Sequence, residues 1–158
     1  MTDPNEEERL TSFEVRDDAA PGPWYRSPVL HDVALLLLRV VAGVMLMQHG
    51  GQKLFGFPAA ADQPFAGAPE LFSRVWIAGV MEVVGGLMLA LGLLTQVVGF
   101  LLAGELAVAY FLVHAPRGFF PILNRGELAA LYSFVFLFFA AAGGGRYSLD
   151  RLLFRQRR

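Results

Sequence analysis

The chain has 158 residues, of which 55% are hydrophobic and 17% are charged, and its formal net charge is −1. It contains no cysteine, which excludes thiolate nucleophiles, disulfide exchange and Cys-ligated iron–sulfur clusters on this chain. Basic residues are not interleaved with aromatic stacking platforms, so nucleic acid is not an expected partner. No spacing typical of a metal site is present, and no metal is predicted. The composition is typical of a single membrane domain with short extramembrane segments.

Residues 1–28 form an acidic, proline-rich tail ahead of the first apolar stretch. Glu6, Glu7 and Glu8 stand where a signal peptide would have basic residues, so this segment is predicted to be a flexible tail. Ser27 followed by Pro28 is typical of a helix N-cap and first-turn proline, which predicts that the first helix starts there. Residues 29–146 are the predicted transmembrane domain, and residues 147–158 a basic amphipathic tail.

Four apolar stretches follow one another along the chain, over residues 33–51, 75–94, 97–115 and 128–142. About 20 largely apolar residues are needed for a helix to cross a bilayer. The last stretch is shorter, and we expect it to be extended by Gly126 and Glu127 at one end and Gly143 at the other. The sequence therefore predicts an all-α fold, a four-helix transmembrane bundle in contact with the lipid bilayer.

Glycines recur in the second and third stretches, where small residues allow helices to approach closely. They are Gly79, Gly85, Gly86, Gly92, Gly99 and Gly104. Close packing is the main interpretation, and room for a ligand at Gly85 and Gly86 is the alternative.

The distribution of Lys and Arg predicts the orientation of the chain. Four crossings place both termini on one side, together with Arg16, Arg26, Arg146, Arg151, Arg155, Arg157 and Arg158. The other side has Lys53, Arg74, Arg117 and Arg125. This bias favours a cell-membrane protein with both termini in the cytoplasm. The leucines and arginines from Ser148 onward predict a short helix lying on the inner membrane surface.

Two charged residues lie deep on the predicted inner side. From a rise of roughly 1.5 Å per residue, Arg39 is about 9 Å and Glu105 about 12 Å from the inner end of their segments. An isolated charge in the membrane is costly, so these depths predict a buried ion pair between Arg39 and Glu105. Intramembrane charges also mark ion paths, which leaves small-solute or proton transport as an alternative.

The outer half contains polar groups from all four segments. Glu82 lies about 10 Å below the outer end of the second segment, too deep to reach water easily, and Lys53 or His49 is its expected partner. We therefore predict Glu82, His49 and Lys53 as catalytic residues. The groups expected to line a ligand pocket beside them are His114, Arg117, Asn124 and Glu127. Snorkelling to phosphates and helix capping are the alternative explanations for Lys53, Arg117 and Glu127.

Several linked motifs resemble those of DoxX family membrane proteins, in order and at the expected spacing over about residues 33–150. They are Leu38-Arg39, Gly43, His49 to Gly56, Glu82 to Gly86, Gly92 to Thr95, Ala107 to Pro121, Asn124 with Gly126 to Leu128, and Ala142 to Asp150. The resemblance implies a four-helix integral membrane protein. It also implies an association with thiosulfate:quinone oxidoreductase or other membrane oxidoreductase complexes. The absence of cysteine argues against direct sulfur transfer by this chain alone.

The leading functional hypothesis is a quinone-interacting subunit of a membrane oxidoreductase that works with a protein partner. Quinone reduction needs proton donors inside an otherwise apolar pocket. The main alternative is a non-enzymatic scaffold or assembly factor. The small size of the chain and its basic tail are consistent with that role. Transport has less support, because no inverted repeat or broken helix is evident. Haem ligation by His49 and His114 is a weaker idea, based only on their similar depth.

Overall fold

The structure, a computed structural model, describes residues 27–59 and 67–154. The chain divides into two units, residues 1–31 and residues 32–158. The predicted flexible tail lies outside the described residues apart from Ser27 and Pro28, and so do the last residues of the basic tail, 155–158.

The first helix, α2 (Pro28–Phe55), begins where the sequence predicted. The Ser27 hydroxyl accepts a hydrogen bond from the backbone N–H of Leu30, at 3.4 Å, as a helix N-cap does. The helix continues four residues beyond the predicted end at residue 51, and Gly56 follows it with a φ of 66°.

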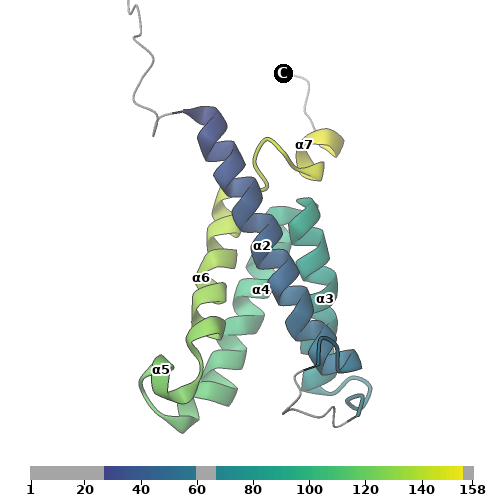
Figure 1. The fold of residues 1–158 in the computed structure, drawn as a ribbon, viewed down its shortest axis with the longest axis vertical. Helices are drawn as coiled ribbons and strands as arrows, with labels where there is room; N and C mark the ends of the chain where they lie inside the picture. The colour runs from purple at the N-terminus through teal and green to yellow at the C-terminus, as the bar shows by residue number, and fades with distance from the viewer. Residues whose placement is uncertain (1–26, 60–66, 155–158) are drawn as a thin grey trace, which may run out of the picture. The chain divides into compact units, whose positions relative to one another are not determined.

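The second and third helices form an antiparallel hairpin within residues 32–158 (Figure 1). Helix α3 (Arg74–Leu91) ends at Gly92, whose φ of 72° lies in the left-handed region that favours glycine. Helix α4 (Thr95–Ala109) starts at Thr95, so the turn lies at residues 92–94 and not at 95–96 as the apolar stretches predicted. The side chain that fixes this start, Asp150, is distant in the sequence: its carboxylate accepts the Thr95 N–H at 2.8 Å.

The α4 direction continues through a π-helix, η2 (Tyr110–His114), and a 3-10 turn, η3 (Ala115–Arg117). Pro116 has no N–H, and its ring excludes the carbonyl four residues earlier from a regular helical position. The helix widens here, and Ala115 N donates to Tyr110 O, five residues back. A one-turn helix, α5 (Pro121–Asn124), then leads to the last long helix.

Helix α6 (Glu127–Ala142) is capped by Gly126 and Gly143, at the boundaries expected from the sequence. The short helix α7 (Leu149–Leu153) follows it, with Ser148 as N-cap. Three segments are long and apolar enough to cross a membrane, namely Pro28–Phe55, Arg74–Leu91 and Thr95–Arg117, while α6 is a shorter apolar helix. The described ranges are all-helical, without strands.

Helices α2 and α3 approach each other through two pairs of glycines. A Cβ on Gly43 would lie 2.5 Å from Gly86 O, and one on Gly50 would lie 2.6 Å from Gly79 O. Both contacts are backbone against backbone, so larger residues would force the helices apart. The predicted packing role is therefore confirmed for Gly79 and Gly86, but it is wrong for Gly104, beside which a Cβ would meet open space.

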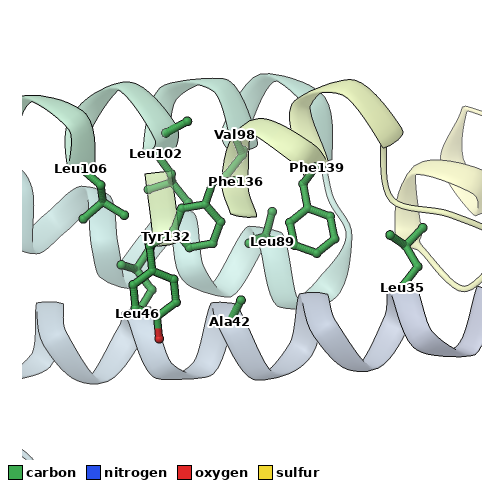
Figure 2. Packing of buried hydrophobic residues seen from close by; sticks show 11 residues of the cluster. Leu35, Ala42, Leu46, Leu89, Val98, Leu102, Leu106, Tyr132, Phe136 and Phe139 are labelled. Carbon is green, nitrogen blue, oxygen red and sulfur yellow. The ribbon is translucent and has the colours of Figure 1, made fainter. Parts of the chain in front are cut away.

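The hydrophobic core lies between α4, α6, α3 and α2 (Figure 2). Tyr132, Phe136 and Phe139 of α6 form a row between the apolar side chains of α4 and those of α2. A Cβ on Gly99 would lie 2.8 Å from Phe136 O, which shows how closely α4 approaches α6.

Polar and apolar side chains are distributed as in a protein whose solvent is lipid. The buried set includes the charged side chains of Arg39 and Glu82, whereas Phe100, Phe111 and Phe134 are each at least 65% exposed. In water, large exposed apolar surfaces of this kind would be an unusual liability. In a bilayer they contact acyl chains, while the charged groups are kept inside the bundle. The chain is a helical membrane protein.

Candidate functional site

The centre of the candidate site is an ion pair between α2 and α3. The Lys53 ammonium lies 2.6 Å from Oε1 of Glu82, and the Glu82 side chain is only 2% exposed. The Lys53 side chain is 34% exposed, so it connects the buried carboxylate with the surface at the end of α2. Of the two partners that the sequence predicted for Glu82, Lys53 is the one that the structure brings within bonding distance.

The second oxygen of Glu82 distinguishes this pair from a saturated structural salt bridge. Glu82 Oε2 is buried and has no hydrogen-bond partner among the described residues. Buried carboxylate oxygens are normally satisfied, and one that is not calls for an explanation such as a ligand, a proton or a catalytic role. Glu82 therefore has one oxygen bonded to Lys53 and one buried oxygen that no donor contacts among the described residues.

Glu105 of α4 lies at the same level as Glu82. A Cβ on Gly85 of α3 would lie 2.8 Å from Leu102 of α4, which aligns these two residues across the hairpin. Glu82 is three residues before Gly85, and Glu105 is three residues after Leu102. Because α3 and α4 run in opposite directions, both steps lead the same distance toward the same end of the bundle. Glu105 interacts electrostatically with Glu82 and Lys53. Its Oε2 atom is also buried without a partner in the described ranges.

His49 precedes Lys53 by four residues on α2, so the two side chains share a face of the helix one turn apart. The His49 ring of α2 and the Tyr132 ring of α6 form an edge-to-face contact with centroids 6.3 Å apart. Tyr132 is buried, and its phenol oxygen is directed toward α2 in Figure 2. All four long helices thus contribute to one set of polar side chains, which we call the polar layer: His49, Lys53, Glu82, Glu105 and Tyr132.

The ion pair predicted between Arg39 and Glu105 is not present. The Arg39 guanidinium is 1% exposed and donates to three backbone carbonyls, Gly144 O, Tyr147 O at 2.6 Å and Ala90 O at 3.4 Å. Arg39 lies at the α3–α4 turn, since a Cβ on Gly92 would be 2.7 Å from its Cζ. Glu105 is ten residues beyond Thr95 in α4, about 15 Å farther along the helix at 1.5 Å per residue. The depths were misjudged because each was counted from the start of its own segment, whereas Arg39, 11 residues beyond Pro28 in α2, lies level with the turn at which α4 begins.

Arg39 belongs instead to a structural cluster that holds residues 144–150 against the α3–α4 turn. The charge that acts favourably on it is that of Asp150. The Asp150 carboxylate also accepts the backbone N–H groups of Leu94 (2.6 Å) and Thr95 (2.8 Å), so it caps the N-terminus of α4 from the other end of the chain. This arrangement is fully explained by the stability that it gives to the fold.

The residues predicted to line the ligand pocket form a separate group at the α5 end. Asn124 is 1% exposed, and its side chain bonds to the backbone of the surrounding loop. Its Nδ2 donates to Gly118 O (2.8 Å), and its Oδ1 accepts from Gly126 N (2.8 Å). Nδ1 of His114 lies 3.2 Å from Asn124 O. Arg117 and Glu127 are exposed. The described contacts do not join this group to the polar layer, and ligand binding by it stays a prediction.

Sequence reasoning placed His49, Lys53 and Glu82 together but omitted two members of the polar layer. Glu105 was assigned to the wrong partner, and a count from the α3–α4 turn in both directions would have paired it with Glu82. Tyr132 resembled ordinary core, because an aromatic residue in an aromatic-rich helix gives no separate signal.

Comparison with known proteins agrees with this architecture. The family model described as DoxX matches residues 34–115, which include most of α2 and all of α3 and α4. A protein of Haemophilus influenzae that bears only the name "Uncharacterized protein" is 42% identical over 127 residues, covering 77% of this chain and 92% of the relative. No significantly similar solved structure was found.

Two further relatives carry more informative names. A Bacillus subtilis protein named "Putative oxidoreductase CatD" is 28% identical and covers 78% of this chain and 90% of the relative. The "Inner membrane protein YqjF" of Escherichia coli is 29% identical, covering 78% of this chain and 95% of the relative. The family match and the Haemophilus relative both span most of the helical domain. This chain belongs to the DoxX family.

Proposed function

We propose that this protein is a quinone-interacting component of a membrane oxidoreductase system, with the polar layer as the site for the quinone head group. The observation that carries the proposal is the state of Glu82. This carboxylate is 2% exposed, has one oxygen fixed at 2.6 Å by Lys53, and has a second buried oxygen without a partner among the described residues. A buried carboxyl group of this kind can exchange a proton with a redox ligand inside the membrane.

The residues of the polar layer fit the chemistry of a quinone. A quinone takes up protons at its carbonyl oxygens when it is reduced, and it dissolves in the same apolar surroundings that its site must provide. The Lys53 ammonium can donate a hydrogen bond to a carbonyl oxygen. Glu82 can hold a proton or release one at Oε2. The His49 ring, one helical turn from Lys53 on α2, and the Tyr132 ring that it contacts provide aromatic surface.

The chain has no cysteine, so no thiol of its own supplies the electrons, and they come from a cofactor or a partner protein. A membrane oxidoreductase is the class of partner that this requirement implies. The name of the Bacillus relative supports the assignment to oxidoreductase chemistry. In this arrangement Glu82 and Lys53 bind the quinone head group and exchange protons with it, and the partner transfers the electrons.

Copurification tests this proposal. The protein is purified in mild detergent, its lipids are extracted, and the quinone content per protein is measured by mass spectrometry. We expect quinone in the wild type and a loss of most of it in Glu82→Gln, which removes the charge that holds Lys53 and the proton-exchanging oxygen. The matched control is Glu70→Gln, the same chemical change at an exposed position in the loop before α3.

The result that would overturn the proposal is equal quinone content in Glu82→Gln, Glu70→Gln and wild type. A wild type that neither retains endogenous quinone nor takes up an added short-tail quinone would also overturn it. Either result would favour a scaffold or assembly role, in which the buried charges serve the fold alone.

A further inference from the structure

The balance of charge in the polar layer sets a condition on its protonation. Lys53 contributes one positive charge, and Glu82 and Glu105 contribute two negative charges if both are ionised. The other titratable groups of the polar layer are His49 of α2 and Tyr132 of α6. A net charge inside an apolar bundle is costly, whereas a neutral set is tolerated. One proton bound by the two carboxyl groups makes Lys53, Glu82 and Glu105 neutral together.

The contacts indicate which carboxyl group has the proton at rest. Glu82 is the one that Lys53 holds at 2.6 Å, and an ammonium at that distance favours the ionised form. Glu105 has no such bond, and its buried Oε2 has no partner in the described part of the chain. A carboxylate in that position is unsatisfied, while a protonated carboxyl group is uncharged and can also donate.

We propose that Glu105 is a second proton-exchanging residue of the site, which holds a proton at rest and shares it with Oε2 of Glu82. Glu105 and Glu82 lie at one level on adjacent helices, as the contact between Gly85 and Leu102 shows. When the proton passes from Glu105 to Glu82, Glu105 becomes the carboxylate that balances Lys53 and the total charge is unchanged. Delivery of that proton to a quinone rests on the proposed function, whereas the shared proton does not.

Infrared spectroscopy of the full-length protein in lipid nanodiscs tests the inference. A protonated carboxylic acid has a C=O stretching band that is separate from the bands of carboxylates and shifts in D₂O. Exposed Asp and Glu side chains are ionised at neutral pH and do not contribute to it. We expect one such band in the wild type and its loss in Glu105→Gln. Glu70→Gln, at an exposed position, should leave the band unchanged.

A second variant makes the test independent of whether Glu105→Gln folds well. In Lys53→Met the positive charge is gone, so both carboxyl groups should become protonated and the band should grow to about twice its wild-type amplitude. A structural role for Glu105 would not produce this change, because Lys53→Met leaves Glu105 itself unaltered.

Two results would overturn the inference: no acid band in the wild type, or an acid band that persists in Glu105→Gln. The first would mean that both carboxylates are ionised at rest. Failure of the proposed function is distinguishable from either result. An acid band assigned to Glu105 in a protein that binds no quinone would refute only the quinone assignment, and quinone binding without the acid band would refute only the shared proton.

Discussion

Substitution of Arg39 by Met tests the assignment of this buried charge to the fold and not to the polar layer. The guanidinium bonds closely to Gly144 O and Tyr147 O, and more weakly to Ala90 O at 3.4 Å. Leaving the two closely bonded carbonyls without donors costs about 1–3 kcal/mol each, hence about 2–6 kcal/mol together. Because removal of a buried charge offsets part of this cost, we expect Arg39→Met to destabilise the protein by about 2–4 kcal/mol.

The assay is unfolding in mixed detergent micelles with increasing SDS, followed by far-UV circular dichroism. The matched control is Arg146→Met, the same substitution at an exposed position in the segment that Arg39 binds, and its effect should stay within about 0.5 kcal/mol. Quinone content per folded protein should be unchanged in Arg39→Met. Equal unfolding midpoints for Arg39→Met and Arg146→Met, or a selective loss of quinone in Arg39→Met, would refute this reasoning.

The remaining predictions concern the cap, the glycines and the orientation. Asp150→Ala removes the acceptor at the start of α4 and should cost about 0.5–2 kcal/mol in the same unfolding assay, and an unchanged midpoint would contradict the capping role. Gly86→Ala places a Cβ 2.7 Å from the Gly43 backbone and should cost about 1–3 kcal/mol. Gly104→Ala meets open space and should be neutral or stabilising by up to about 1 kcal/mol, so a comparable loss in both variants would count against the packing assignment. Because the chain has no cysteine, single cysteines at exposed Ala68 and Arg146 can report orientation. An impermeant maleimide should label whole cells or spheroplasts at Ala68→Cys only, and labelling at Arg146→Cys only would reverse the proposed orientation.

The sequence was sufficient to predict the helices, because a long apolar stretch that crosses a membrane satisfies its own backbone hydrogen bonds only as a helix. Ser27, Pro28, Gly126 and Gly143 even located helix ends to within a residue. The end of α3 and start of α4 were missed by two to three residues, because the group that caps α4 is Asp150, 55 residues away in the chain from Thr95. Such a contact cannot be inferred from local sequence.

The candidate site could be predicted where its residues share one helix face, or where a buried charge requires a partner of opposite sign. Glu82 needed a cation, and Lys53 was the available one at the right end of α2. Arg39 and Glu105 were paired wrongly because their similar depths were counted from the starts of their own segments, without the register between the helices. Backbone carbonyls, which are present at every residue and carry no sequence signal, proved to be the partners of Arg39. The register between helices, and not the charge, decides which buried groups meet.

The proposal that the polar layer binds the quinone head group is tested most directly by photolabelling in nanodiscs. An azido-quinone is irradiated with the wild-type protein, and the modified peptides are mapped by mass spectrometry. We predict adducts concentrated at the level of Lys53 and Glu82, competed by unlabelled quinone and lost in Glu82→Gln but not in Glu70→Gln. Adducts spread over lipid-facing residues such as Phe100 and Phe134, insensitive to competitor and to Glu82→Gln, would contradict the account.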